Sequence, residues 1–480
     1  AKHFAVHSGP EPSRHVFDAK VSERDLRETY LPAFRSLIVD AGVYSIMGAY
    51  NRFRGEACCA SPFLSGILRN EWGFKGYIVS DCWALADIWQ YHKIAKDEAE
   101  AAAMAVKTGT DLECGNTYKA LPEAFKRGLI TEKDLDICVG RLLTARMKLG
   151  MFDPDEKVAY AQIPFSVNDS PAHGQLARMA AQKSIVLLKN ANHTLPLKKN
   201  LAKIAIIGPN ADEVESLWGN YNGIPSHPVT VLQGIKNKIA PQAEVLYAQG
   251  SELADGISKL TPIPSIYLET EDGKQGALGE YFDNNKLEGK PFFTRVDDNV
   301  DFYWEAGSPD QRMPVDNFSV RWTTYLKVPK TGDYEIGIWS MPNFKIYCDD
   351  KEILGGDNEH HAFHSQKKLT LETGKRYKLV FDYKNYHGDG AASLLWTTPQ
   401  PNMLADAVET AKKADVVVLV LGLNQRLEGE EMPIQVDGFK GGDRTHLNLP
   451  KTQEKLMEAI KATGKPVVLV LLNGSALSIN

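Results

Sequence analysis

The first 155 residues alternate short apolar segments with longer amphipathic ones. Strands are predicted at residues 2–6, 44–50, 77–80 and 110–114, each running into polar or small residues. Helices are predicted between them at residues 22–41, 62–71, 97–108 and 132–150, the first opening at Ser22 and the third closing at Gly109. Repeated strand–helix units imply parallel strands, in a barrel or a doubly wound sheet, and four such units are half of an eightfold barrel.

The pattern changes twice further along the chain. A helix at 172–183 and strands at 184–188 and 204–208 are predicted first, and the same style returns after residue 400 with helices at 403–414 and 452–463 and strands at 416–422 and 467–472. These two blocks are expected to form one sheet. Between them, about 264–398, aromatic residues alternate with polar ones at a period of two, which predicts an inserted antiparallel β-sandwich.

The predicted fold class is therefore α/β, with the C-terminal part of a (β/α)8-type barrel, and an α/β sandwich domain interrupted by an antiparallel β-sandwich. The expected segments are 1–155 (partial barrel), 156–171 (linker), 172–263 (first part of the α/β sandwich), 264–399 (inserted β-sandwich) and 400–480 (second part of the α/β sandwich).

Composition narrows the classes of ligand. The 480 residues are 43% hydrophobic and 24% charged, an ordinary globular balance, and 55 basic against 61 acidic side chains leave a net charge of −6. Such a chain offers no basic face to nucleic acid or anionic lipid, and a small neutral ligand suits it better. No apolar run is long enough to span a membrane.

The six cysteines are scattered and lack the Cys-x-x-Cys spacing of zinc sites, so they imply no metal site. Buried free thiols are the default for them, and a contact or disulfide between Cys59 and Cys82, which follow successive strands, is the alternative. His360, His361 and His364 cluster on a polar loop of the insert, where surface histidines are a better interpretation than metal ligands.

Polar side chains end three of the predicted parallel strands. Asp81 follows the strand at 77–80, Lys2 and His3 close another strand of the same series, and Tyr50 closes a third. Barrel enzymes place catalytic groups at such strand ends, and Trp83 beside Asp81 offers a face on which a sugar ring can stack. The competing interpretations are that Asp81 caps the next helix and that His3 is a structural histidine.

The loop after the strand at 416–422 is long and carries the acidic cluster Glu428, Glu430 and Glu431, followed by Asp443 and Arg444. A carboxylate on such a loop could supply a general acid held on the second domain. A solvated acidic loop, with Asp443 and Arg444 as a neighbouring ion pair, is the alternative.

These residues together resemble glycoside hydrolase family 3. The resemblance covers nearly the whole chain in the same order, and the insert resembles a protective-antigen-type carbohydrate-binding sandwich. The matching motifs are Lys2-His3-Phe4, Gly48-Ala49-Tyr50-Asn51, Val79-Ser80-Asp81, Ile206-Ile207-Gly208-Pro209-Asn210-Ala211-Asp212, and a Glu-x-Glu followed by Asp443-Arg444.

The resemblance implies a nucleophile at Asp81 and an acid/base at Glu430, with Glu428 and Glu431 as less favoured alternatives and Arg444 as a further candidate. It also implies that Lys2, His3 and Tyr50 line the subsite of the terminal sugar, joined by Trp83. The chemistry would be retaining, with carboxyl groups about 5–5.5 Å apart and no metal or cofactor.

The activity implied is that of an exo-acting β-D-glycosidase releasing terminal glucose or xylose from oligosaccharides. The motifs Arg14-His15-x-Phe17, Cys59-Ala60 and Ser80-Asp81-Cys82 resemble the β-xylosidase branch of the family, so a dedicated β-xylosidase of xylan breakdown is the first alternative. A glycan-binding protein without turnover is the alternative of another class.

The family has further barrel strands upstream of Lys2-His3 and further sheet strands beyond residue 480. We therefore expect this chain to be a segment of a longer enzyme, or to be completed by another chain. A periplasmic or secreted location is expected, although no signal peptide is visible; a leader could precede Ala1, so its absence says nothing about compartment. The insert is a candidate to bind sugar, to narrow the mouth of the active site or to mediate a homodimer.

Overall fold

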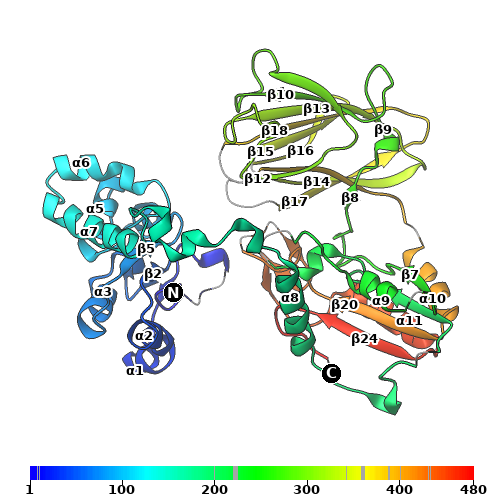
Figure 1. The fold of residues 1–480 in the computed structure, drawn as a ribbon, viewed down its shortest axis with the longest axis horizontal. Helices are drawn as coiled ribbons and strands as arrows, with labels where there is room; N and C mark the ends of the chain where they lie inside the picture. The colour runs from blue at the N-terminus through cyan, green and yellow to red at the C-terminus, as the bar shows by residue number, and fades with distance from the viewer. Residues whose placement is uncertain are drawn as a thin grey trace.

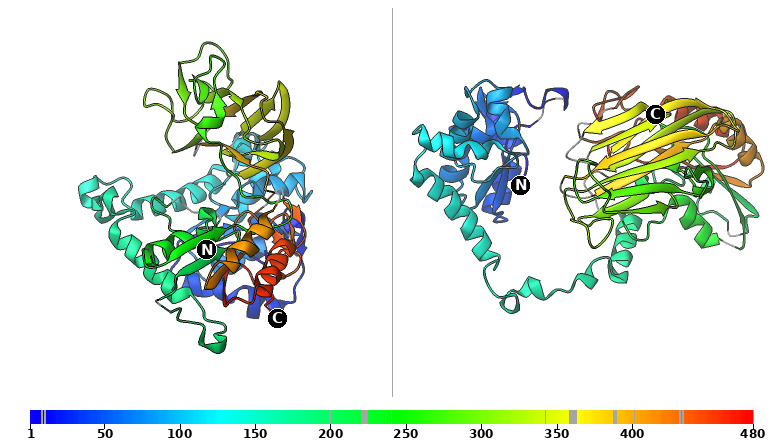
Figure 2. Two further views of the ribbon diagram at one scale, coloured as in Figure 1. Left: turned by 90° about the vertical axis from the view of Figure 1, so that its right-hand side faces the viewer. Right: turned by 90° about the horizontal axis from the view of Figure 1, so that it is seen from above.

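The computed structural model describes residues 1–480 apart from 8, 10, 199, 220–224, 240, 342, 358–362, 387–389, 401, 431, 433 and 480. The chain forms an N-terminal body, drawn blue to cyan, an α/β body, drawn green and orange to red, and a β-rich body inserted into the second (Figure 1). An extended connection around residues 151–170 joins the first two bodies, as the view from above shows (Figure 2).

The N-terminal body is built on parallel β segments. Strand β2 (Ser45–Gly48) pairs in parallel with β5 (Tyr77–Ser80), and parallel bridges add Phe4 beside Gly48 and Leu112 beside Val79. The predicted order of four parallel segments is thus confirmed, although the outer two are single bridges. A small sheet joins β1 (Asp18–Ala19), β3 (Arg52–Phe53) and β4 (Glu56–Ala57).

Several helices of this body begin at a side-chain cap. The predicted helix at 97–108 is α5 (Glu98–Thr108), which begins where Asp97 accepts a hydrogen bond from the Glu100 amide and ends at Gly109 with φ +89°. The others are α1 (Glu23–Asp25), α2 (Pro32–Val39), α3 (Pro62–Gly66), α4 (Ala84–Gln90), α6 (Leu121–Lys126) and α7 (Glu132–Lys148).

The α/β body carries a four-stranded parallel sheet in the order β24-β20-β6-β7. Its strands are β6 (Lys203–Ile207), β7 (Glu244–Ala248), β20 (Val416–Gly422) and β24 (Val467–Leu472). Helices α10 (Met403–Lys412) and α11 (Lys451–Ala462) pack on one face, and α9 (Val231–Ile239) packs on the other. Because β6 pairs with β20, the two sequence blocks do share one sheet.

One expected strand of this body is wrong. Helix α8 (Pro171–Ser184) runs up to residue 184, and residues 185–188 that follow it are coil with 64% to 76% of their surfaces exposed. A strand needs a neighbouring edge to pair with, and no described strand pairs with this apolar stretch.

The insert consists of two antiparallel sheets that enclose one aromatic core. One sheet has the order β11-β10-β13-β18-β15-β16 with β9 beside β13, and the other has the order β12-β19-β14-β17 with β8 beside β19. Trp322, Tyr281, Tyr334 and Phe381, all at most 1% exposed, lie in the core between them. Alternating burial along β13 confirms the predicted period of two.

The strands of the larger sheet are β9 (Leu268–Glu269), β10 (Ala277–Phe282), β11 (Phe293–Asp297), β13 (Ser319–Leu326), β15 (Asn343–Cys348), β16 (Lys351–Asp357) and β18 (Tyr377–Lys384). Those of the smaller sheet are β8 (Thr261–Pro262), β12 (Asp301–Glu305), β14 (Gly332–Met341), β17 (Phe363–Leu371) and β19 (Gly390–Thr397). Three two-residue strands, β21 (Gln435–Val436), β22 (Phe439–Lys440) and β23 (Asp443–Arg444), lie in the long loop after β20.

Candidate active site

Asp81 lies at the carboxyl end of β5 and is 7% exposed. The amide of Cys82 donates to its Oδ1 at 2.9 Å, and Nε2 of His3 lies 3.2 Å from its Oδ2. The backbone bond fixes the orientation of the carboxylate, so that Oδ2 is the oxygen directed at His3. The interpretation of Asp81 as a helix cap is not supported, because α4 begins after Trp83 without a side-chain cap.

His3 contacts Asp81, and the charge of Glu430 also acts on it. Burial lowers the pKa of its imidazole, and the nearby charges of Asp81 and Glu430 act in the opposite direction. The neighbouring Lys2 is exposed, whereas His3 is half-buried. Among the sugar-binding candidates from the first strand, His3 is therefore the one in direct contact with Asp81.

Tyr50 is buried beneath a cation that the sequence analysis did not assign to the site. The guanidinium of Arg14 lies 4.4 Å from the centre of the Tyr50 ring, and the ring of His15 meets the same ring edge-on at 4.7 Å. Nδ1 of His15 is 2.8 Å from Oδ2 of Asp87, which is 2% exposed. The sequence offered Arg14-His15 only as part of a family motif.

Arg14 also links the N-terminal body to the α/β body. Although it belongs to the N-terminal body and is only 4% exposed, its Nη2 donates to Oε1 of Glu430 on the loop after β20. The segment that carries Arg14 reaches across from the N-terminal body toward this loop (Figure 1). Glu430 thus adjoins the cluster of Tyr50, His3 and Asp81.

The other loop candidates face elsewhere. Oε1 of Glu428 lies 3.9 Å from Nη1 of Arg444, and Arg444 also donates to backbone oxygens of His446, Asn448 and Ala476. These hydrogen bonds stabilise the loop after β20 within the α/β body. Glu431 lies outside the described residues, as do His360 and His361 of the insert.

Trp83 and the cysteines complete the surroundings of Asp81. Trp83 has φ +67° and its amide donates to the carbonyl of Cys114 at 2.7 Å. Cys82 is disulfide-bonded to Cys114, while Cys59 is a buried free thiol. The alternative of a Cys59–Cys82 bond is therefore wrong. The parallel bridge between Val79 and Leu112 brings the ends of their two chain segments together, so Cys114 rather than Cys59 meets Cys82.

Within the described part of the chain, no group of three or more potential metal ligands comes together. His364, the one described member of the predicted histidine cluster, instead bonds Glu215 of the α/β body, with Nε2 at 2.7 Å from Oε1. None of the described helices combines the length and the apolar character needed to cross a bilayer.

Comparison with known proteins identifies the family of the chain. Residues 1–145 match the glycosyl hydrolase family 3 N-terminal domain, and residues 185–480 match the glycosyl hydrolase family 3 C-terminal domain. The chain belongs to glycoside hydrolase family 3.

Relatives within family 3 include proteins named as β-xylosidases and as β-glucosidases. A xylan 1,4-β-xylosidase of Xylanibacter ruminicola is 38% identical over 492 residues, which covers 100% of this chain and 56% of the relative. A probable exo-1,4-β-xylosidase of Aspergillus clavatus is 45% identical over 234 residues, 47% of this chain and 30% of the relative. The structure of a β-glucosidase from Kluyveromyces marxianus in complex with glucose aligns with a TM-score of 0.71 at 26% identity, covering 98% of this chain and 56% of that one. The chain thus spans 56% of the length of each of the two relatives above that match it throughout.

Proposed function

We propose that this chain carries the catalytic centre of a retaining, exo-acting β-D-glycosidase that releases terminal xylose or glucose from oligosaccharides. The observation that carries the proposal is that Asp81, at the end of β5, lies 3.2 Å from His3, while Arg14 of the same body binds Glu430 on the loop after β20. The negative charges of both carboxylates act on the pKa of His3. A terminal sugar between them would contact His3 and Tyr50, with Lys2 and Trp83 at the rim.

In this proposal Asp81 attacks the anomeric carbon through Oδ2 and forms a glycosyl–enzyme bond, while Glu430 gives its proton to the departing glycosidic oxygen. Glu430 then takes a proton from water, whose oxygen displaces Asp81 and releases the sugar with its original configuration. The Cys82 amide and His3 hold the Asp81 carboxylate in one orientation, and Arg14 holds Glu430. Glu428 is the less suitable acid, because its carboxylate faces Arg444.

The names of the relatives favour xylose, since the relative that spans the whole chain is a xylan 1,4-β-xylosidase. A β-glucosidase structure aligns over nearly the same span, and a pocket distinguishes one hydroxymethyl group by only about 1–3 kcal/mol. We therefore include both sugars in the proposal.

The finer features of the fold belong to the same proposal. The parallel segments at Phe4, β2, β5 and Leu112 would be part of a (β/α)8-type barrel, and the insert would be a carbohydrate-binding sandwich of the protective-antigen type. The disulfide between Cys82 and Cys114 supports a periplasmic or secreted location, because such bonds persist in oxidising compartments.

The test is a comparison of initial rates on 4-nitrophenyl β-D-xyloside and β-D-glucoside with the full natural gene product. A mechanism-based 2-fluoro glycoside should label Asp81 covalently, and Asp81→Asn should abolish both labelling and turnover. Binding of xylo-oligosaccharides without turnover or labelling would instead establish a glycan-binding protein.

A further inference from the structure

Arg426 lies four positions before Glu430 on the loop after β20, and its side chain reaches the inserted sandwich. Nη1 donates to the carbonyl of Ser258, at the entrance to the insert, at 2.6 Å. Nη2 donates at 3.2 Å to Oε1 of Gln366 on β17. The loop that carries the candidate acid is therefore bonded directly to the insert.

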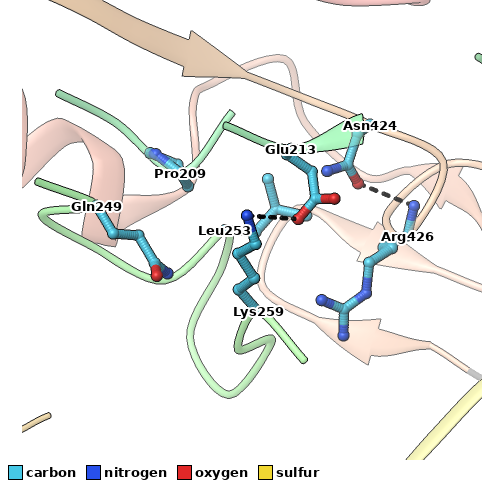
Figure 3. A pocket seen from close by; sticks show the side chains of 7 residues that line it. All are labelled: Pro209, Glu213, Gln249, Leu253, Lys259, Asn424 and Arg426. Atoms are coloured by element: carbon cyan, nitrogen blue, oxygen red, sulfur yellow. Dashed lines mark hydrogen bonds and ion pairs between the residues drawn. The ribbon is translucent and has the colours of Figure 1, made fainter. Parts of the chain in front are cut away.

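The charged groups around the Arg426 guanidinium come from both the α/β body and the insert. Burial lowers the pKa of Arg426, and the carboxylates of Glu215, Glu213 and Glu335 act in the opposite direction. Glu213 and Lys259 lie beside Arg426 and Asn424 (Figure 3). Burying a cation is costly, and these opposite charges offset part of that cost.

The insert is itself fixed at the same place. Nε2 of Gln366 donates to Oε2 of Glu335 on β14 at 2.9 Å and to the carbonyl of Gly256 at 3.2 Å. Two residues before Gln366, His364 contacts Glu215. Arg426 therefore bonds to a face of the insert that has other polar bonds to the α/β body.

The stretch between Arg426 and Glu430 has little freedom to absorb a displacement. Leu427 is fully buried in an apolar cluster with Leu423 and Phe439. Gly429 packs closely on Gly442: a Cβ added to Gly442 would lie 1.8 Å from the carbonyl oxygen of Gly429. A shift of the backbone at Arg426 would consequently be passed on to Glu430.

We propose that Arg426 is a positioning residue through which the inserted sandwich sets the placement of Glu430. This inference rests on the proposed function. It makes the insert part of the catalytic apparatus, in addition to any sugar it binds.

The test compares Arg426→Met with wild type on two β-D-xylosides that differ in leaving group. Departure of 2,4-dinitrophenol needs no proton, whereas departure of phenol does, so only the phenyl glycoside reports the placement of the acid. We expect kcat/KM to fall about 10- to 100-fold on the phenyl glycoside, as general acid catalysis and its alignment supply factors of this size, and less than about threefold on the dinitrophenyl glycoside. Arg426→Lys should recover part of the loss.

Arg321→Met is the control, because it removes an arginine that bonds within the insert, with Nε and Nη2 each 2.6 Å from an oxygen of Asp382. It should change neither substrate by more than about twofold. Should Arg426→Met fail to fold, Gln366→Leu removes the acceptor on the insert and should give the same leaving-group pattern with a smaller loss.

Equal losses on both substrates, or no loss on either, would overturn the inference while leaving the proposed function intact. A wild-type protein inactive on every glycoside would refute the proposed function, and the inference would fall with it.

Discussion

Replacing Arg14 by Met should impair catalysis more than it impairs folding. The substitution keeps the approximate length of a buried side chain but removes its hydrogen bond to Glu430 and its charge above the Tyr50 ring. A hydrogen bond between charged groups contributes about 1.5–3 kcal/mol, and a cation over an aromatic ring adds about 0.5–2 kcal/mol. Because the Glu430 side chain is 36% exposed, its carboxylate can stay hydrated without Arg14, which limits the loss of stability. Glu430 would nevertheless lose the hydrogen bond that holds it.

If about 2–4 kcal/mol of this interaction is present in the transition state, kcat/KM on an aryl β-D-xyloside should fall about 30- to 1000-fold. Arg14→Lys should be intermediate, since an ammonium keeps the charge but not the planar fork. Arg24→Met is the control, because Arg24 is 80% exposed and pairs with Glu28 on the surface of the same body. An Arg14→Met enzyme that unfolds at the wild-type temperature and retains more than a third of wild-type kcat/KM would refute the reasoning.

Three further predictions concern stability. Burial lowers the pKa of His92 to about 4, so between about pH 6.5 and 4 the unfolded chain binds a proton that the folded chain does not. His92 should therefore cost about 2–3 kcal/mol of stability between pH 7 and pH 4.5. Urea titrations should show this loss reduced in His92→Phe but not in His173→Phe, which alters the exposed helix α8. Reduction of the Cys82–Cys114 bond, which links positions 32 residues apart, should cost about 3–4 kcal/mol, and Cys114→Ala should reproduce that loss without reductant. Asp111→Asn should cost about 3–5 kcal/mol by thermal or urea unfolding, because the buried carboxylate accepts hydrogen bonds from two arginines.

Local pattern was sufficient for most elements. The period of the apolar residues gave the parallel order in the N-terminal body, the shared sheet on both sides of the insert and the alternating strands within it. It failed at residues 185–188, where four apolar residues have strand character but no edge to pair with. Burial of an apolar run depends on a neighbour, which the run itself does not specify.

The candidate site was predictable only in part, because its connections join distant segments. The sequence pattern predicted that Asp81 and His3 lie at strand ends. Their contact follows from the parallel bridges of the N-terminal body. Arg14 and Arg426 were not assigned roles. Nothing near Arg14 in the sequence indicates that it meets Glu430, 416 positions later, and nothing near Arg426 indicates that it meets Gln366. Cys82 illustrates the same limit, since spacing alone did not select Cys114.

The topology of the α/β sheet explains why Glu430, the candidate acid, and Arg426, which bonds to the insert, lie on the same loop. The chain moves from β6 to β7 in one direction across the sheet and from β20 to β24 in the other, so the order reverses between β6 and β20. In parallel sheets the loops at the carboxyl ends of such strands diverge and leave a crevice, the usual place for a ligand. Here Asn210 after β6 and Asn424 after β20 bond across that gap, with Nδ2 of Asn424 3.2 Å from Oδ1 of Asn210. Because the loop of Glu430 starts there and the insert leaves the body after β7, contact between sandwich and acid loop follows from the fold.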